Sequence, residues 1–528
     1  MKWRWPWRRA GTESARAVET IPESFPDRSR LEWLEWDGRT LRWALTATDA
    51  FRAELLVDGI VFQRIESPAG AHVYACTFDF SPTGNAELEF SITESAARAA
   101  VGAPWRVRQG AQAPAGVDQW TQAPCWLAPL AGTPQLPARA WPALPDVAIV
   151  VPIYNAAESV ARCLAALERW TPSARWILVD DASTDPAIAP LLKRHAHNST
   201  VEVVRHGHNR GFTSAVNTGI EASGNADVVL LNSDTEVGPR WLEALRLAAY
   251  SDASIGTATA VSDNAGAFSV PELEQYCPIP ERWNLVAAQR AVLQQAGLRY
   301  PELPTGNGFC LFIKREVIAR IGVMDAAAFP AGYGEENDFC QRAIRAGFRN
   351  VIAGNVLVRH ERSASFGDAR RAALGAQGMA VLRARYPDYE VDVGATLYSF
   401  VRRVLDYRVR RTWAGNDGRY GVHAPRQRLL VTAAADAPFA AAAGYEVYVL
   451  HERPHLQLQR FDDGSLAGVA PDGATAASHD ETIRGWLVSH AIEGVYAPDP
   501  GELATHVARL AADLGIPGLS TLAASTAS

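Results

Sequence analysis

The sequence predicts an α/β protein with three folded parts. A Rossmann-like central domain is preceded by an all-β, sandwich-like domain and followed by a partial, doubly wound α/β unit. Three observations predict this fold class: apolar residues alternate with a period of two before residue 103, strand–helix units repeat from residue 146, and such units return after residue 426. A chain of 528 residues has room for these parts, and 48% hydrophobic with 21% charged residues is typical of globular proteins.

Charge and cysteine content narrow the class of protein. A net charge of −7 disfavours a general nucleic-acid binder, which needs a basic surface to displace the counterions of phosphates. Six cysteines without a C-x-x-C pair indicate a reduced, cytosolic protein rather than a disulfide framework. Because no run of about 18 apolar residues occurs, the sequence predicts no transmembrane helix.

The N-terminal third divides into a tail, a β-domain and a linker. Residues 1–30 are basic and rich in Trp and Arg, which fits either a peripheral contact with an anionic membrane surface or a tail that binds nothing. Residues 31–103 alternate as Leu41 and Trp43 do, with turn signals between the runs, and predict a β-sandwich-like domain for packing or for carbohydrate binding. Residues 104–145 hold eight prolines and predict an extended linker.

The central domain, residues 146–386, begins with an apolar strand at 147–151. A helical stretch follows, in which Val160, Cys163 and Leu167 recur at spacings of three and four. Three more strand–helix units have strands at 176–179, 201–204 and 228–231 and helices that end near residues 198, 223 and 250. Four consecutive units predict a parallel sheet with helices on both faces. Ligands bind such sheets at the carboxyl ends of the strands, so the residues after each strand are the candidates for chemistry.

The remaining residues predict a helical, basic connector at 387–426 and a partial Rossmann-like unit at 427–528. In that last unit strands are expected at 429–432, 445–450 and 494–497, with helices near 481–490 and 502–514. It carries no glycine-rich phosphate-binding motif, so a phosphate site has no support there.

Two polar clusters follow strands of the central sheet. Asp180 and Asp181 follow the second strand, and Asn232, Ser233 and Asp234 follow the fourth. Two interpretations explain the first cluster equally well: it caps the next helix, or it binds a ligand. Two clusters at one sheet edge favour a site, because hard carboxylate oxygens suit Mg²⁺ or Mn²⁺ bound together with a diphosphate.

A third cluster opens a later helix with Glu335, Glu336 and Asp338. The helix dipole favours acids in a first turn, but three acids in four residues exceed what capping needs. His360 ends a strand-like run, and taken alone such a histidine is more often structural than a ligand.

Taken in order, these segments resemble the inverting glycosyltransferases of family 2, which have the GT-A fold. The resemblance covers about residues 146–386. It is carried by the segments 150–155, 180–185, 209–212 with Asn217, 230–237, 305–308, 332–342 and His360.

The resemblance implies a site for a nucleoside-diphosphate sugar and a divalent metal. Pro152, Tyr154 and Asn155 would line the nucleotide pocket, and Asp181 would hydrogen-bond the base. The metal ligands would be Asp234 and His360. The remaining residues implied to contact the donor are Asp180, Asn209, Arg210, Gly211, Asn217, Asn232, Ser233, Gly306 and Asn307. Asn232 stands where the family motif has its first Asp, which removes one negative charge from the site.

The resemblance also implies the catalytic base. Glu336 matches the second acid of the family's Glu-Asp element, although the family usually has Asp at that position. Its side chain is longer by one methylene, and proton abstraction needs a heavy-atom reach of about 2.6–3.2 Å. Asp338 is the alternative base, and Glu335 is the neighbouring acid of the same element.

These residues imply a metal-dependent, inverting transfer of a sugar to a hydroxyl of a glycan or lipid-linked acceptor, in the synthesis of bacterial surface polysaccharides at the cytoplasmic membrane face. Residues 427–528 resemble the N-terminal half of a GT-B glycosyltransferase without its second half, which suggests a structural appendage. Two alternatives remain: a non-catalytic scaffold that binds glycans or nucleotide sugars, and a sugar-phosphate nucleotidyltransferase. Residues 154–158 lack the glycine-rich, basic loop that the latter requires.

Overall fold

A computed structural model gives the structure of the chain in two compact units, which are residues 1–59 with 63–129 and residues 60–62 with 130–528. The residues that it describes are 29–36, 40–57, 59–77, 87–95, 100–101, 105–108, 146–273, 276–298, 300–361, 368–397, 400–415, 424–432, 445–452, 456–462, 464, 466–470, 476–497 and 501–519. The predicted tail therefore lies outside the described residues up to position 28, and so does the predicted linker apart from residues 105–108.

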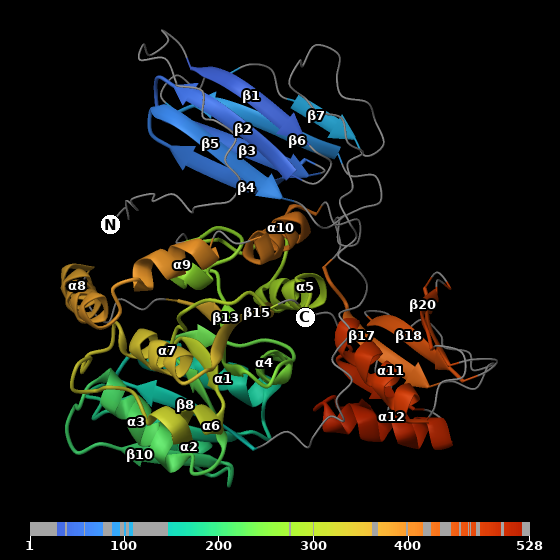
Figure 1. Cartoon of the computed structure of the whole chain (residues 1–528). Helices are drawn as coiled ribbons and strands as arrows, with labels where there is room; N and C mark the ends of the chain where they lie inside the picture. The colour runs from blue at the N-terminus through green and yellow to red at the C-terminus, as the bar shows by residue number, and fades with distance from the viewer. Residues whose placement is uncertain are drawn as a thin grey trace. The chain divides into compact units, whose positions relative to one another are not determined.

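The first unit contains two β-sheets (Figure 1). One sheet has the order β1 (Arg30–Trp36), β2 (Thr40–Ala47), β5 (Gly70–Thr77), and the other β4 (Ile60–Ser67), β3 (Phe51–Val57), β6 (Glu87–Glu94), β7 (Trp105–Arg108). Alternate residues of β3 are buried, as the period of two predicts. Strand β7 pairs antiparallel with β6, so these four residues of the predicted linker belong to a sheet.

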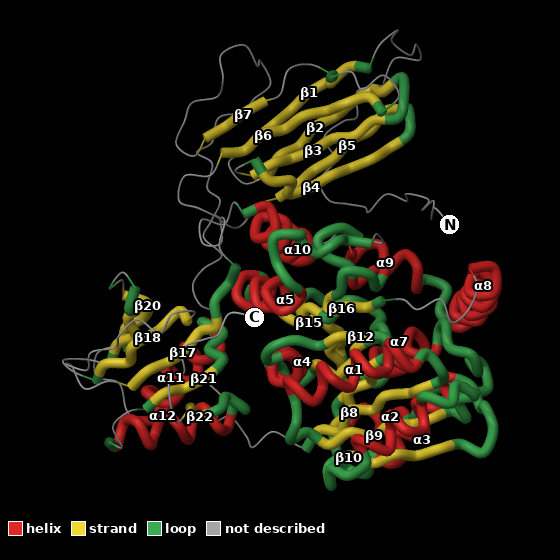
Figure 2. The backbone as a smooth tube through the Cα atoms, turned by 180° about the vertical axis from the view of Figure 1, so that it is seen from behind, coloured by secondary structure: helices red, strands yellow, loops and turns green. Residues whose placement is uncertain are grey.

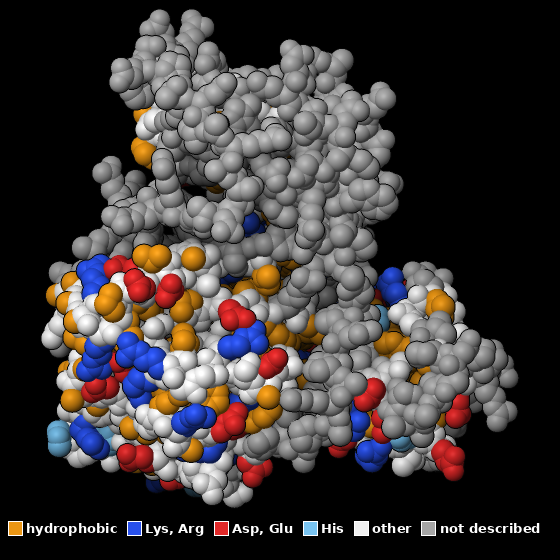
Figure 3. All heavy atoms as spheres, viewed as in Figure 1, with side chains coloured by type: hydrophobic (Ala, Val, Ile, Leu, Met, Phe, Trp, Pro, Cys, Tyr) orange, Lys and Arg blue, Asp and Glu red, His pale blue; other side chains and the backbone are white. Residues whose placement is uncertain are grey.

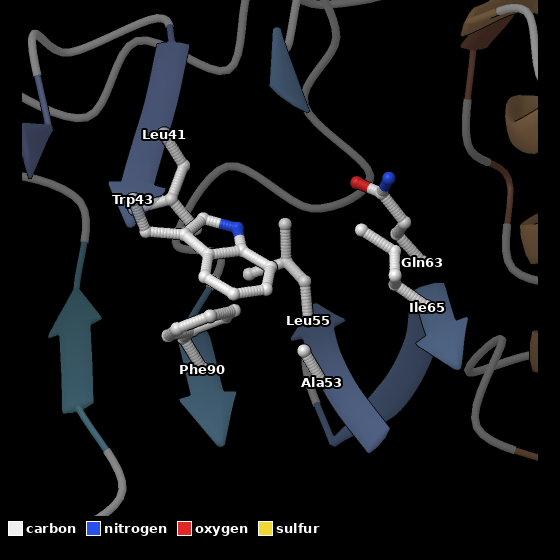
Figure 4. Close-up of a pocket in the computed structure, with 7 residues that line it drawn as sticks. All are labelled: Leu41, Trp43, Ala53, Leu55, Gln63, Ile65 and Phe90. Atoms are coloured by element: carbon white, nitrogen blue, oxygen red, sulfur yellow. The ribbon is translucent and has the colours of Figure 1, made fainter. Parts of the chain in front are cut away.

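The apolar faces of these sheets enclose a small cavity, drawn in Figure 4. Trp43 from β2, Leu55 from β3 and Phe90 from β6 line it and are 2%, 3% and 3% exposed. Its volume of about 10 Å³ is close to the space that one water molecule needs, so these side chains form a packed core.

The second unit is built on a seven-stranded mixed sheet. Its order is β10 (Val201–Arg205), β9 (Arg175–Asp180), β8 (Val147–Ile153), β11 (Asp227–Leu231), β14 (Cys310–Ile313), β13 (Ile255–Val261), β15 (Arg349–Leu357). Strands β8 to β11 are mutually parallel, as predicted. Strand β14 is antiparallel to both of its neighbours, so the sheet is not parallel throughout.

Helices cover both faces of this sheet, because its central strands are apolar on both sides. Ile149 and Val151 of β8 share a core with helices α1 (Ala157–Trp170), α2 (Ile188–His195), α4 (Trp241–Tyr250) and α5 (Leu285–Gln295). Ala148 and Val150 of β8 instead pack in the core of α3 (Phe212–Ala222), α6 (Arg315–Ile321) and α7 (Glu335–Arg345). Figure 2 shows the helices and strands from behind.

Two smaller features lie beside the main sheet. Strands β12 (Thr235–Glu236) and β16 (Arg359–His360) pair antiparallel and bring position 235 opposite position 360. Helices α8 (Asp368–Arg385), α9 (Tyr389–Leu397) and α10 (Phe400–Ala414) follow. None of the described helices combines the length and the apolar composition that a membrane span requires.

The C-terminal residues form a second α/β sheet with the order β20 (Leu466–Val469), β19 (Gln457–Arg460), β18 (Tyr445–His451), β17 (Gln427–Thr432), β21 (Gly494–Tyr496), β22 (Gly518–Leu519). Helices α11 (Ala476–Ser489) and α12 (Glu502–Asp513) accompany it. Arg290 of α5 forms a buried ion pair with Glu493 at 2.7 Å. On the face drawn in Figure 3, basic, acidic and apolar side chains are interspersed over the central domain.

Candidate active site

The turn after β8 is fixed to the turn after β9. Asn155 adopts a left-handed backbone conformation with φ of 58°. Its Oδ1 accepts hydrogen bonds from the Thr184 and Asp185 amides at 2.8 and 2.9 Å, and its own amide donates to Ser183 Oγ at 2.9 Å. Asn155 therefore joins the two turns, while Tyr154 is 40% exposed.

The two acids after β9 are buried and engaged within the protein. Asp180 is 1% exposed, accepts the Ser183 amide at 2.8 Å and forms an ion pair with Arg205. Its carboxylate thus stabilises the end of β9, and contact of Asp180 with a donor stays a prediction. Pro152 is likewise buried inside β8.

Asp181 holds the loop that precedes α3. Its Oδ1 accepts the Arg210 amide at 2.8 Å and faces Nδ1 of His206 at 2.7 Å, and its Oδ2 accepts the Gly211 amide at 2.9 Å. A carboxylate offers about four acceptor positions, so one position on Oδ2 is left for a ligand. The sequence reasoning missed His206, because no local pattern marks it as the partner of Asp181.

Helix α3 contacts the segment that leads into α7. Thr213 donates from its hydroxyl to the Phe329 carbonyl, and Asn217 exchanges two hydrogen bonds with the Met324 backbone at 2.8 and 3.0 Å. Both ends of the Asn217 amide thus join α3 to this segment, and its contact with a donor stays a prediction. Asn209 and Arg210 have exposed side chains, which leaves them accessible to a donor.

Gly211 cannot carry a side chain without displacing its surroundings. Its φ is +89°, and a Cβ atom there would overlap the carbonyl oxygen of Pro330, whereas a Cβ at Gly207 would meet nothing within 4 Å.

We expect Gly211→Ala to weaken nucleotide binding about tenfold or more, because such strain costs about 1–3 kcal/mol. Gly207→Ala should leave binding unchanged. Titration of both variants with nucleoside diphosphates checks this, and equal affinities would contradict it.

Asp234 and His360 are brought together by the pairing of β12 with β16. His360 Nε2 lies 3.4 Å from Asp234 Oδ1, and both side chains are largely buried, at 11% and 15% exposure. His360 is held by the Asp263 carboxylate, which accepts its amide at 3.0 Å, and by Phe309, which stacks on its ring at 5.3 Å.

The hydrogen bonding of His360 leaves its Nε2 facing the carboxylate. Nδ1 lies 3.1 Å from the carbonyl oxygen of Asn264, and a carbonyl only accepts, so Nδ1 carries a hydrogen. In the neutral ring Nε2 then directs a lone pair towards Asp234, an arrangement that a cation between them stabilises. The carboxylate of Asp234 and the imidazole of His360 are groups that fit a divalent metal. Among the described residues, no group of three or more acidic, His or Cys side chains is placed to bind one.

The partners of His360 follow strand β13. Asp263 and Asn264 are not among the predicted site residues. Both nevertheless follow a strand, which is where ligand sites form in such sheets.

The remaining predicted donor contacts lie at the same sheet edge. Asn232 follows β11, and its Oδ1 is buried without a hydrogen-bond partner, which leaves an acceptor for a ligand hydroxyl. Ser233 is half-buried beside it. Asn307 Oδ1 accepts the Phe309 amide at 3.2 Å, and a Cβ at Gly306 would lie 3.0 Å from Cys340 Sγ, so both shape the loop before β14.

Glu335 and Glu336 form a coupled acidic pair at the start of α7. Burial raises the pKa of Glu335 well above its usual 4.5, and the neighbouring charge of Glu336 raises it further. Burial also raises the pKa of Glu336, although backbone hydrogen bonds and one from the Glu335 carboxyl oppose the rise. Both carboxyl groups therefore hold a proton to a higher pH than an exposed glutamate does. One Glu336 oxygen, Oε2, is buried without a partner.

Replacing Glu335 by Gln should stabilise the protein at alkaline pH. A buried acid with a raised pKa makes the folded state lose stability as the pH rises above the unfolded value of 4.5. Glu335→Gln removes this loss, at about 1.4 kcal/mol for each unit of the rise. We expect a higher Tm than wild type near about pH 8 and an equal Tm near about pH 4, measured by thermal unfolding. A variant that is less stable at both pH values would contradict this assignment.

Asp338, the alternative base, is fully buried and paired. Burial alone would raise its pKa, but hydrogen bonds from Arg342, Arg385 and Tyr386 outweigh this and lower the pKa below 3.8. The contacts measure 2.8, 2.7 and 2.8 Å. A carboxylate held by two guanidinium groups is a weak base without access to a substrate, so the geometry favours Glu336.

The two cavities described in the structure are not lined by these residues. One is the sandwich cavity above, and the other, of about 20 Å³, is lined by α4, α5 and α11 side chains such as Leu247, Leu293 and Leu487.

Part of the chain matches a family of known proteins. Residues 148–322 match the family described as Glycosyl transferase family 2. The pre-mycofactocin glycosyltransferase of Mycobacterium tuberculosis is 29% identical over 248 residues, 46% of this chain and 48% of that protein. The succinoglycan biosynthesis protein ExoU of Rhizobium meliloti is 24% identical over 208 residues, 39% of this chain and 59% of that protein. The chain thus spans about half the length of these curated relatives.

A solved structure shows a more distant likeness. The mannosyltransferase PcManGT from Pyrobaculum calidifontis, in complex with GDP-Man and Mn²⁺, is 19% identical. It has a TM-score of 0.35 and covers 53% of this chain and 77% of that chain. The sequence match rests on the residues that contain β8 to β14 and the first two strand-end clusters. Residues 148–322 of the central domain therefore resemble glycosyltransferase family 2.

Proposed function

We propose that the central domain transfers a sugar from a nucleoside-diphosphate donor to a hydroxyl group of a glycan or lipid-linked acceptor, with inversion and with the help of Mn²⁺ or Mg²⁺. The observation that carries this proposal is the facing pair of Asp234 and His360, together with a buried pair of carboxyl groups in the same domain. The first pair suits a diphosphate-bound cation, and the second suits a general base.

The donor would lie across the carboxyl ends of β8, β9 and β11. Tyr154 offers an exposed ring for the base, and Asp181 retains one acceptor position on Oδ2 for a base N–H. Asn232 Oδ1 is an unpartnered acceptor that a ribose hydroxyl would satisfy. Arg210 is exposed at the end of its loop, and its guanidinium would bind the phosphates of the donor.

Asp234 and His360 would hold the metal, and the diphosphate would supply further oxygen ligands. When bound, the cation neutralises the charge that grows on the departing diphosphate. The protein's own part is to fix both ligands: Asn264 orients the imidazole through Nδ1, and the Asp263 carboxylate holds the backbone of His360.

Glu336 would accept the proton of the attacking acceptor hydroxyl. Burial raises its pKa, which makes it a better proton acceptor than an ordinary glutamate, and the carboxyl group of Glu335 donates a hydrogen bond to it. One displacement assisted by one base inverts the anomeric carbon. The acceptor class is suggested by relatives such as the succinoglycan biosynthesis protein ExoU. A cytoplasmic location and peripheral membrane contact belong to the same proposal.

A donor screen tests the proposal. Purified protein is incubated with UDP-, dTDP- and GDP-sugars, with and without Mn²⁺ or Mg²⁺, while thermal shift and nucleoside diphosphate release are recorded. We expect one donor to raise the Tm only with metal and to be hydrolysed slowly or transferred. If no nucleotide sugar binds with either metal, the domain does not act as a transferase, and binding to glycans alone would then favour the scaffold interpretation.

A further inference from the structure

The turn that precedes Glu336 has an unusual backbone. Gly332, Tyr333 and Gly334 have φ values of 86°, 67° and 147°. Positive φ is uncommon for a residue with a side chain, so Tyr333 keeps this conformation only if its surroundings impose it. The position of Glu336 depends on this turn, because α7 starts at the next residue.

Helix α8 lies directly against the turn. A Cβ atom at Gly378 would overlap the carbonyl oxygen of Tyr333 and would lie 3.8 Å from the Gly334 amide nitrogen. Glycine at position 378 therefore allows the helix to approach the backbone of the turn. A Cβ at Gly375, one turn earlier on the same helix, would meet nothing within 4 Å. Of these two positions, only 378 thus lies in close contact with the turn.

The end of α8 also holds the residues that follow Glu336. Arg385 Nη1 and the Tyr386 hydroxyl both donate to Asp338 Oδ1, at 2.7 and 2.8 Å. The second arm of Arg385 donates to Asp325 Oδ2 at 2.9 Å. Tyr389, at the start of α9, accepts a hydrogen bond from Asn337 at 2.8 Å.

We propose that α8 positions the catalytic base: Gly378 holds the turn on one side of Glu336, and Arg385 with Tyr386 holds Asp338 on the other. These are positioning residues, since none touches the reacting atoms. The inference rests on the proposed function, in which Glu336 is the base. Helix α8 lies beyond residues 148–322, the part of the chain that matches the family. The transferase site would therefore be incomplete without a segment outside that match.

A purely architectural helix would give a different result on mutation. Loss of packing lowers the free energy of unfolding and changes kcat and donor KM little, whereas a displaced base lowers kcat and leaves donor KM unchanged. Gly375→Ala and Gly378→Ala form a matched pair, because both replace a glycine of the same helix by the strongest helix former.

The experiment measures kcat and donor KM of both variants with the nucleotide sugar that the donor screen identifies, at a temperature where both are folded. We expect Gly378→Ala to lower kcat about 10²-fold, the loss that a base displaced by about 1 Å produces. Donor KM should stay within about twofold of wild type, and Gly375→Ala should match wild type in both constants. Hydrogen–deuterium exchange should show faster exchange of amides 332–338 in Gly378→Ala only.

Tyr386→Phe provides a second variant in case Gly378→Ala does not fold. It removes one hydroxyl, should lower kcat with unchanged donor KM, and should also speed amide exchange at residues 332–338. Equal kcat and equal exchange in wild type, Gly378→Ala and Tyr386→Phe would overturn the positioning role while leaving the transferase proposal intact. If wild type turns over no donor, the proposed function fails, and amide exchange alone still decides whether α8 holds the turn.

Discussion

Glu336→Gln is expected to lower kcat by about 10²–10⁴-fold, the usual contribution of a general base. Gln occupies nearly the same volume and still accepts hydrogen bonds through Oε1, so the fold and the donor site should be preserved. Donor binding with metal, measured by thermal shift, should equal that of wild type. The measurement is kcat and donor KM under saturating acceptor, together with nucleoside diphosphate release.

Glu335→Gln is the matched control for this variant, because it alters the adjacent acid in the same way. Glu335 serves as the hydrogen-bond donor of the pair, and a Gln amide can still donate to Glu336. We therefore expect kcat to fall less than about tenfold in this control. If instead Glu335→Gln abolishes turnover and Glu336→Gln does not, the base is Glu335.

His360→Ala and Asp234→Ala are each expected to abolish the metal-dependent part of donor binding. Loss of a residue that only supports a metal ligand typically lowers metal affinity about 10–100-fold, so loss of a ligand should exceed about 100-fold. The thermal shift produced by nucleotide sugar with Mn²⁺ should then fall to the shift seen without metal. Isothermal titration of Mn²⁺ in the presence of nucleoside diphosphate measures the loss directly.

His197→Ala is a suitable control, because His197 is an exposed histidine on the segment after α2. It should bind donor and metal as wild type does. The opposite pattern also has a clear meaning. If His360→Ala and Asp234→Ala lower the Tm without ligand but keep the full metal effect, the two side chains form an ion pair, and the metal is bound elsewhere.

The outline of the central domain could be read from local patterns. Apolar strands such as 147–151 and helical spacings such as Val160, Cys163 and Leu167 predict the four parallel strands and their helices. The antiparallel direction of β14 could not be predicted in this way, because strand direction depends on the path of the connection rather than on the residues of the strand. The same patterns placed Asp234 correctly at a strand end.

The roles of individual acids depended on partners far away in the sequence. Asp180 and Asp181 are identical neighbours in the sequence, but one pairs with Arg205 and the other holds the 206–211 loop. Asp338 and Glu336 are two residues apart, and Asp338 pairs both with Arg342 in the next turn of the same helix and with Arg385, 47 residues later. The local sequence contains the first of these partners, but not Arg385.

By itself, therefore, the sequence determined the fold class, the sheet edge at which polar residues gather and the match of residues 148–322 to glycosyltransferase family 2. The tertiary structure alone decided that His360 faces Asp234, that burial raises the pKa of Glu335 and that Gly378 of α8 contacts the turn before it. The physical reason is that periodicity and capping are local properties of the chain, whereas burial, charge pairing and close backbone approach arise between segments that only the folded chain brings together.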